Sequence, residues 1–153
     1  MSIENQPIYL VLENIRSLFN VGSMFRCADV FAVSKIFLCG YTGTPPRSQI
    51  SKTALGADEW ISWEHKTQTA QLLKNLKKQG FAIVALEAGQ GGKLLPDFKA
   101  QFPLVLVVGN EIDGVSKKVL ALADETLEIP MLGQKESLNV AIACGIALYQ
   151  LRN

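Results

Sequence analysis

Arginine and asparagine side chains gather near the N-terminus in a pattern that suits phosphate binding. The group consists of Asn14, Arg16, Asn20, Gly22 and Arg26. A guanidinium group forms paired hydrogen bonds with phosphate oxygens, and a helix N-terminus adds backbone N–H donors. One arginine alone is more often simply solvated, but the grouping predicts a phosphate-facing surface. Arg47 and Lys52, which flank the next loop, are also placed to meet a polyanion.

A glycine-rich turn begins at Leu86, directly after an apolar run. Its sequence, Leu86-Glu-Ala-Gly89-Gln-Gly91-Gly92, resembles the acidic-x-Gly-x-Gly loop of Rossmann-type enzymes that bind S-adenosylmethionine. Such a loop should open a helix and be followed by several further strands, whereas Pro96 soon interrupts this chain. We therefore expect either a ligand wall at the end of a strand or a flexible surface turn, and not a Rossmann domain.

A second polar turn, at residues 109–116, places Asn110 and Glu111 directly after another apolar run. It is either an ordinary turn that caps the following helix or part of a site. Apolar runs also end at Leu86 and Ile129. Three turns at the carboxyl ends of parallel strands would meet at one edge of the sheet, which favours a cofactor pocket there.

Alternating strand and helix patterns predict the elements that hold these turns. Continuous apolar runs predict buried strands at residues 8–12, 35–39, 81–86 and 104–108, with a short strand before Pro130. Helical spacing predicts helices at 20–31 with Asn20 as N-cap, at 51–57, at 69–79 and from Ser137 to Leu151. The segment Trp60-Ile-Ser-Trp63 predicts an edge strand, with both tryptophans expected in the core or at an interface. Together these elements predict an α/β fold, a mostly parallel sheet with helices on both faces.

Composition limits the kind of protein that the chain can be. Its 153 residues, 48% hydrophobic and 19% charged, suit a single domain over residues 1–153. The net charge of +1 gives no global field for nucleic acid, so a polyanion must meet a local patch. Cys27, Cys39 and Cys144 are odd in number and widely spaced, which favours reduced thiols, a cytoplasmic location and no metal site. No apolar run approaches the ~20 residues of a membrane span, so no membrane partner is expected.

Three blocks of sequence share an ordered pattern with one known family. The first is Asn14-Ile-Arg16 with Asn20-x-Gly22-x-x-x-Arg26. The second is Leu106-Val-Val-Gly-Asn-Glu-x-x-Gly114, and the third is Ile129-Pro-Met-x-x-x-x-Glu-Ser-Leu-Asn139-Val-Ala. On these blocks the chain resembles the SpoU/TrmH-type RNA 2′-O-ribose methyltransferases of the SPOUT superfamily. The resemblance extends from Ile8 to Leu151 and includes Lys52-Thr-Ala-Leu-Gly56-Ala.

The resemblance implies a deep trefoil knot near the C-terminus, an exception to the rule that chains are unknotted. It also implies S-adenosyl-L-methionine as cofactor and a homodimer that meets through the knotted regions. The C-terminal helix is kept narrow by Ala141, Ala143, Gly145 and Ala147, which would allow a tight passage. Many relatives carry added RNA-binding domains, and none is seen before Ile8 or after Leu151, so we expect a single SPOUT domain.

The family's residue roles are expected at the matching positions of this chain. The implied catalytic residues are Arg26, Asn20, Glu111, Ser137 and Asn139. The implied cofactor-binding residues are Leu86, Glu87, Gly109, Asn110, Ile129, Met131, Ser137 and Leu138. The expected RNA contacts are Asn14, Arg16, Arg47 and Lys52. We expect Arg26 to orient and stabilise the ribose 2′-hydroxyl or an RNA phosphate electrostatically, because a guanidinium with a pKa above about 12 is a poor base.

The resemblance therefore implies methyl transfer from S-adenosyl-L-methionine to a ribose 2′-hydroxyl of tRNA or rRNA. We favour tRNA, because small relatives that methylate the wobble ribose are similarly minimal. Two alternatives remain, a non-catalytic RNA-binding or assembly module of the same fold and an RNA base methyltransferase. The presence of Arg26, Asn20 and Asn139 argues against the first, and the block from Asn20 to Arg26 argues against the second.

Overall fold

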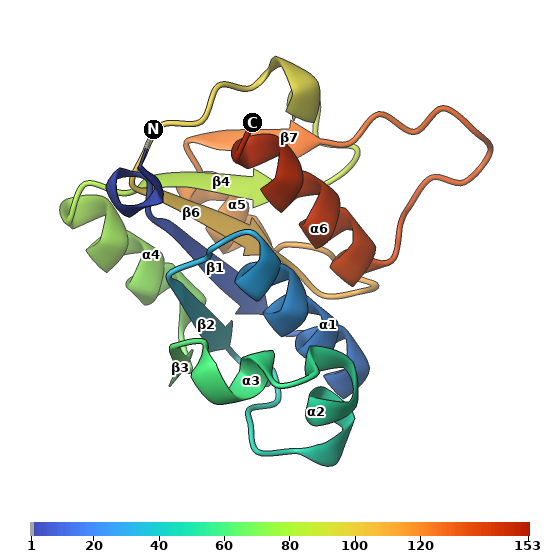
Figure 1. The fold of residues 1–153 in the computed structure, drawn as a ribbon. Helices are drawn as coiled ribbons and strands as arrows, with labels where there is room; N and C mark the ends of the chain where they lie inside the picture. Colours follow the sequence, from blue (N-terminus) through green and yellow to red (C-terminus); the bar gives the residue numbers. More distant parts are fainter. Residues whose placement is uncertain (1) are drawn as a thin grey trace.

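The computed structural model describes residues 2–153 and is built around one parallel sheet (Figure 1). The strands are β1 (Ile8–Glu13), β2 (Lys35–Cys39), β3 (Trp63–Lys66), β4 (Ala82–Leu86), β5 (Lys93–Leu94), β6 (Leu104–Val108) and β7 (Glu125–Glu128). Their order across the seven-stranded sheet is β3-β2-β1-β6-β4-β7-β5. Every neighbouring pair runs parallel, so the predicted sheet type is confirmed.

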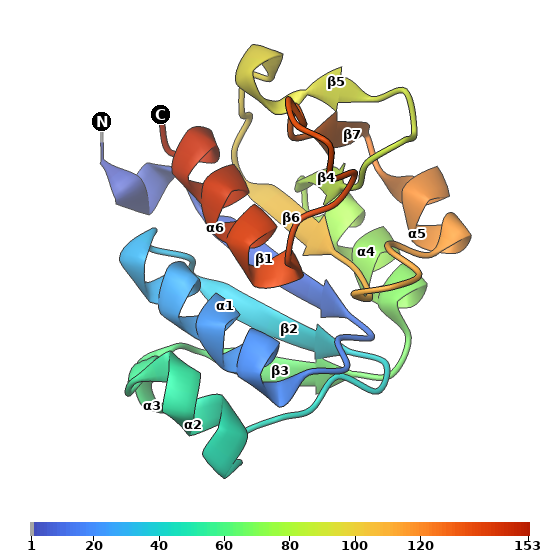
Figure 2. The same cartoon turned by 90° about the vertical axis from the view of Figure 1, so that its right-hand side faces the viewer.

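Helices cover both faces of the sheet, as predicted. They are α1 (Leu18–Val30), α2 (Ser48–Ala54), α3 (Ala57–Trp60), α4 (Thr69–Lys78), α5 (Lys117–Leu122) and α6 (Val140–Leu151), with 3-10 turns η1 (Ile3–Asn5) and η2 (Leu95–Asp97). One face carries α1, α2, α3 and α6, and the opposite face carries α4 and α5 (Figures 1 and 2). Each face therefore has its own apolar core.

Strand β1, in the interior of the sheet, shows why these strands are continuous apolar runs in the sequence. Leu10 and Leu12 pack into the core beneath α1 and α6, while Val11 between them packs into the core beneath α4 and α5. All three side chains are fully buried. A strand that is covered on both faces has no solvent side, so its sequence does not alternate between apolar and polar residues.

Two helix starts beside the site differ from the prediction, and α2 also begins earlier than predicted, at Ser48 instead of Ser51. Helix α1 begins at Leu18, and its N-cap is Ser17, whose Oγ accepts a hydrogen bond from the Asn20 backbone N–H at 3.2 Å. Asn20 therefore lies within the first turn, and its assignment as N-cap was wrong. Helix α6 begins at Val140 and not at Ser137, with Asn139 as its N-cap. In each case the start is set by the side chain that accepts hydrogen bonds from the first free N–H groups.

The prediction of an edge strand at residues 60–63 is wrong for residues 60–62. Trp60 ends the short helix α3 and is 61% exposed, with its indole N–H donating to Asp29 at 2.7 Å. Strand β3 begins only at Trp63 and pairs with β2. Gly56 precedes α3 in a left-handed conformation, with a φ of 99°, and the helical turn that follows extends to Trp60.

Residues 129–139 leave β7, arch outside the sheet and return to α6, which lies beside α1 (Figures 1 and 2). The trefoil knot expected in this part of the chain fits the family that the sequence resembles, and it stays a prediction. Among residues 2–153, no helix has both the length and the apolar character needed to cross a membrane.

Arg152 fixes the end of α6 to distant parts of the chain. Its guanidinium donates to the backbone oxygens of Phe31 at 2.8 Å, Gln6 at 2.7 Å and Ala32 at 2.9 Å. The same group lies over the ring of Phe102, 5.9 Å from its centre. Burial lowers the pKa of Arg152 from its ordinary value. The end of α6 is thereby tied to the end of α1 and to the N-terminal segment.

Candidate active site

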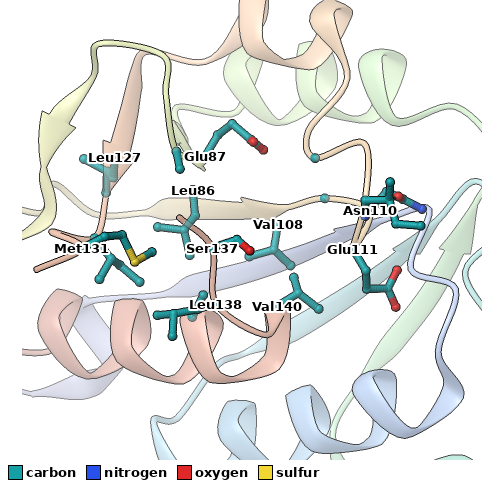
Figure 3. A pocket seen from close by; sticks show the side chains of 16 residues that line it. Leu86, Glu87, Val108, Asn110, Glu111, Leu127, Met131, Ser137, Leu138 and Val140 are labelled. Carbon is teal, nitrogen blue, oxygen red and sulfur yellow. Dashed lines mark hydrogen bonds between the residues drawn. The ribbon is translucent and has the colours of Figure 1, made fainter. Parts of the chain in front are cut away.

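A pocket lies at the carboxyl ends of β4, β6 and β7, beside the loop that leads into α6 (Figure 3). Its walls are formed by Leu86, Glu87, Ala88, Val108, Gly109, Asn110, Glu111, Ile112, Gly114, Leu127, Ile129, Met131, Ser137, Leu138, Val140 and Ala143. All of the residues predicted to bind a cofactor are on these walls, as are the predicted catalytic residues Glu111 and Ser137. The three turns therefore converge at one edge of the sheet, while the residues' roles stay predictions.

Apolar side chains from three strands and α6 make much of the pocket wall. Leu86 ends β4, Val108 ends β6 and Leu127 lies near the end of β7. Val140, the first residue of α6, faces them across the pocket (Figure 3). A mostly apolar pocket with a few polar groups at its rim is typical of a small-molecule or cofactor site.

The turn after β6 is held in a tight shape that only glycine permits at two positions. A Cβ on Gly109 would lie 2.4 Å from the backbone carbon of Gly114, and Gly114 itself has a φ of 72°. The carboxylate of Glu87 lies directly against Gly114 and accepts the Val115 N–H at 2.8 Å. Glu87 therefore braces this turn, in addition to lining the pocket.

Asn110 uses the hydrogen-bonding capacity of its side chain within the protein. Its Nδ2 donates to the backbone oxygen of Asn14 at 2.9 Å and to the hydroxyl of Tyr41 at 2.7 Å. Its Oδ1 accepts the N–H groups of Ile112 and Asp113, each at 2.8 Å. An amide has two donor hydrogens and two lone pairs on oxygen, so a ligand would have to displace one of these bonds.

Glu111 points from the pocket rim toward the start of α1 (Figure 3). Its carboxylate accepts the backbone N–H groups of Arg16 and Ser17, each at 2.8 Å, and Nδ2 of Asn20 at 3.0 Å. Burial would raise the pKa of Glu111, but these hydrogen bonds outweigh it and hold the pKa below its ordinary value. Glu111 is therefore an ionised group that positions the first sequence block against the second.

Asn20 and Asn139 extend this network to the third block. Asn139 Nδ2 donates to Asn20 Oδ1 at 3.2 Å, while Asn139 Oδ1 accepts the N–H groups of Ala141 at 2.9 Å and Ile142 at 3.1 Å. A continuous chain of hydrogen bonds thus runs from Glu111 through Asn20 to Asn139 and the N-terminus of α6. The structure brings these three predicted catalytic residues together at the rim of the pocket.

The predicted arginine and lysine contacts are not brought into this pocket. Arg26 lies on the exposed side of α1, and within residues 2–153 its guanidinium has no hydrogen-bond or ion-pair partner. The backbone N–H of Arg16 is bound to Glu111, so this residue lies beside the rim of the pocket. Its side chain is exposed to solvent. Arg47 precedes α2 and Lys52 lies on it, both exposed to solvent.

Thr42 is a structural residue of the site that the sequence analysis missed. It is buried, and its hydroxyl accepts the Ile15 N–H at 3.0 Å. The same hydroxyl lies 3.1 Å from the backbone oxygen of Leu12 and 2.7 Å from that of Cys39. It therefore joins the turns after β1 and β2. The only sequence signal is a threonine shortly after the glycine that ends a strand.

The cysteines and the single histidine do not form a reactive centre. Burial raises the pKa of Cys39 to about 12 and also raises the pKa values of Cys27 and Cys144, which remain protonated thiols at neutral pH. His65 is exposed on the edge strand β3, with Nε2 2.8 Å from the Gly40 oxygen. Across the described chain, no group of three or more His, Cys, Asp or Glu side chains is placed to hold a metal ion.

Two curated proteins are similar to this chain over nearly all of its length. The 23S rRNA (guanosine-2′-O-)-methyltransferase of Vibrio parahaemolyticus is 33% identical over 144 residues, covering 94% of this chain and 58% of the relative. The tRNA (guanosine(18)-2′-O)-methyltransferase of Aquifex aeolicus is 33% identical over 146 residues, covering 95% of this chain and 68% of the relative. The chain thus spans 58% and 68% of the lengths of these two relatives.

Solved structures with the same fold include an AdoMet-bound rRNA methyltransferase from Sinorhizobium meliloti, with a TM-score of 0.90 and 28% identity over 97% of this chain and 56% of that one. Another, described as giving structural insights into the 2-OH methylation of C/U34 on tRNA, has a TM-score of 0.83 and 26% identity over 95% of this chain and 94% of that one. A model of the SpoU rRNA Methylase family matches residues 7–149. The chain therefore belongs to the SpoU rRNA Methylase family.

Proposed function

We propose that this protein transfers the methyl group of S-adenosyl-L-methionine to a ribose 2′-hydroxyl of RNA. The observation that carries the proposal is the hydrogen-bonded chain from Glu111 through Asn20 to Asn139 at the rim of the pocket. It connects all three sequence blocks and ends at the pocket, whose wall includes Glu111. The names of the two curated relatives, both guanosine 2′-O-methyltransferases, support the same reaction.

The pocket suits S-adenosyl-L-methionine. Leu86, Leu127 and Val140 provide apolar walls for a flat adenine ring, and the turns at Gly109 and Ile129 bring backbone groups to the rim. A solved relative contains this cofactor. When bound, its sulfonium supplies an activated methyl group. The protein's remaining task is to hold the ribose oxygen in line with that methyl group and to stabilise the negative charge that develops on the oxygen.

Arg26 is the group that we assign to this electrostatic task. Its guanidinium is unpaired within residues 2–153, so it is available to a ribose hydroxyl or to a phosphate of the RNA. A guanidinium stays protonated at neutral pH and therefore stabilises charge without accepting the hydroxyl proton. Ser137, on the pocket wall, and the pair Asn20 and Asn139, at the rim, would orient the ribose.

The substrate that we favour is tRNA. Of the relatives described above, two act on rRNA and two on tRNA by their descriptions. The relative described for position 34 of tRNA is the one that this chain matches over 94% of its length. The matched region of that protein is therefore nearly all of it, which supports tRNA over rRNA for this chain. We further propose that the protein works in the cytoplasm, where its free thiols stay reduced.

We also propose that two copies of the chain associate through the groove between α1 and α6. This groove is lined by Asn20, Ser23, Cys27, Phe31, Asn139, Ala141, Ile142, Gly145, Ile146 and Tyr149. None of these residues is charged, as expected for the centre of a protein interface. The exposed side of α6 carries three large side chains, those of Ile142, Ile146 and Tyr149. The buried residues of α6 lie on its other side and pack against α1 and the sheet. A second copy would cover this stripe.

Nucleoside analysis tests the reaction. The purified protein is incubated with radiolabelled S-adenosyl-L-methionine and with tRNA or rRNA from a strain that lacks it, and the RNA is then digested to nucleosides. We expect label in one 2′-O-methylated nucleoside from tRNA. Label on a base would instead assign an RNA base methyltransferase. RNA binding with no label in either RNA would indicate a non-catalytic binding module.

A further inference from the structure

Tyr41 is exposed to solvent yet is held in place at two points. The residue is 60% exposed. Its backbone N–H donates to Oδ1 of Asn14 at 3.1 Å, and its hydroxyl accepts from Nδ2 of Asn110 at 2.7 Å. Most exposed tyrosines have free hydroxyls and mobile rings. Here two asparagines from the motif blocks, one after β1 and one after β6, hold a ring that the core does not use.

The surrounding backbone is shaped to allow this arrangement. Gly40 has a φ of 64°, and a Cβ at that position would lie 1.9 Å from Oδ1 of Asn14. Asn14 is itself in the left-handed region, with a φ of 55°, a conformation that asparagine tolerates better than most residues. The buried hydroxyl of Thr42, next in sequence, joins the same two turns. Tyr41 therefore stands on a rigid base.

The position of Tyr41 relates it directly to the pocket. Strands β2, β1 and β6 are neighbours in the sheet, and Tyr41, Asn14 and Asn110 follow them in that order. The cofactor pocket occupies the ends of β6, β4 and β7. Asn110 belongs to both groups, so the carboxyl edge of the sheet has a pocket on one half and an exposed, anchored aromatic ring on the other.

An exposed arginine lies on the neighbouring turn, after β1. Arg16 has an exposed side chain and follows Ile15, whose N–H is bound by Thr42, the residue after Tyr41. A flat aromatic surface on one turn and a guanidinium on the next offer one partner for a nucleobase and one for a phosphate. The combination fits a single-stranded nucleotide of an RNA that already has another ribose at the pocket.

We propose that Tyr41 is an RNA-positioning residue, on whose ring a base near the methylated nucleotide stacks. The inference rests on the proposed function, because it needs RNA as the substrate. It adds a contact that the sequence blocks do not contain, and it gives Asn14 and Asn110 the task of orienting this ring. Every base has a flat face, so the contact adds affinity and alignment with little base selectivity.

Three variants separate stacking from loop anchoring. Tyr41→Leu removes the ring, Tyr41→Phe keeps the ring and removes the bond to Asn110, and Trp60→Leu removes another exposed aromatic ring at α3. For each variant, the affinity for fluorescently labelled tRNA is measured, and the affinity for S-adenosyl-L-methionine is measured by calorimetry. We expect Tyr41→Leu to weaken tRNA binding by about fivefold to about a hundredfold, the range of one base–aromatic stack. Tyr41→Phe should stay within about threefold, and Trp60→Leu and all cofactor affinities should be unchanged.

Ultraviolet crosslinking gives a readout that does not depend on variant stability. The wild-type protein is irradiated with bound tRNA, and nucleotide adducts are mapped by mass spectrometry to the tryptic peptide 36–47, which contains Tyr41. We expect an adduct on Tyr41. Adducts confined to other peptides, or equal losses of binding in Tyr41→Leu and Tyr41→Phe, would overturn the inference. If the wild type methylates tRNA while Tyr41→Leu has an unchanged KM for tRNA, the inference fails and the proposed function stands.

Discussion

Asn139 donates a hydrogen bond from Nδ2 to Oδ1 of Asn20 at 3.2 Å, across 119 positions of sequence. The same Asn139 side chain caps α6 through its Oδ1. One residue thus begins the C-terminal helix and fixes the orientation of the Asn20 amide, whose Nδ2 is bound to Glu111. The folding of α6 and the assembly of the site are coupled through a single amide group.

The two tasks of Asn139 can be separated by substitution. Asn139→Asp keeps an oxygen to cap α6 but places a second oxygen against Oδ1 of Asn20, so we expect near-normal stability and a loss of methyl transfer of at least about tenfold. Asn139→Ala removes the cap as well and should lower the free energy of unfolding by about 0.5–2 kcal/mol. Urea denaturation and turnover assays on both variants provide the measurements. Full activity in Asn139→Asp would contradict a role for this contact in catalysis.

Arg26→Ala should abolish methyl transfer and leave cofactor binding within about threefold of the wild type. The reason is that Arg26 lies outside the pocket and makes no bond within residues 2–153, so its removal costs little stability and no cofactor contact. Calorimetry with S-adenosyl-L-methionine and single-turnover kinetics distinguish the two effects. Lys74→Ala, at an exposed cation on α4 on the opposite face of the sheet, is the matched control. Lost cofactor affinity with normal turnover would show that the assigned role is wrong.

Glu111→Gln should lower the free energy of unfolding at neutral pH by about 1–2 kcal/mol. The three donors use both carboxylate oxygens, whereas the amide has only one acceptor oxygen, so at least one donor at this partly exposed site loses its partner. The pKa of Glu111 is lowered on folding, so its stabilisation is complete above the unfolded value of about 4.3 and is lost as the pH falls through the lower folded value. The difference in melting temperature between wild type and variant should therefore be constant above about pH 5 and shrink below about pH 4. Glu59→Gln, which replaces an exposed carboxylate on α3, is the matched control. A difference that grows in acid would contradict this account.

Ile142→Glu should convert the proposed dimer to monomers. Ile142 is 57% exposed on the uncharged groove between α1 and α6, so a buried carboxylate there would be desolvated without a partner. Light scattering after gel filtration measures the mass. Leu55→Glu makes the same kind of change at a residue that is 60% exposed on another surface and should leave the mass unchanged. A wild-type protein that is monomeric at the concentrations of the activity assay would exclude the dimer as the working form.

Arg152→Lys should destabilise the fold although it keeps the positive charge. Lysine has no planar fork and cannot reach the oxygens of Phe31, Gln6 and Ala32 together. We expect a loss of about 1–3 kcal/mol in the free energy of unfolding, with normal turnover well below the melting temperature. Urea denaturation measures it. An unchanged midpoint would mean that the three bonds add nothing to stability.

The sequence determined the class of fold and the identity of the turns that form the site. Apolar runs such as Leu104–Val108 predict strands covered on both faces. Such a strand has no face in contact with solvent, so none of its positions favours a polar residue. The order of strands, helices and polar turns then places the turns after Leu86, Gly109 and Ile129 at one edge. Local capping was less well predicted, since Ser17 and Asn139 begin helices that apolar spacing alone placed at Asn20 and Ser137.

Only the tertiary structure decided what each polar side chain does. Asn110 and Glu111 are adjacent in sequence, yet one holds Tyr41 and the other holds the start of α1. Arg26 belongs to the first sequence block but stays outside the pocket. These outcomes depend on the neighbour order β2-β1-β6 and on hydrogen bonds between residues far apart in the chain. Residue type and spacing set the hydrogen bonds that a side chain is able to make, whereas the packing of distant segments selects its partner.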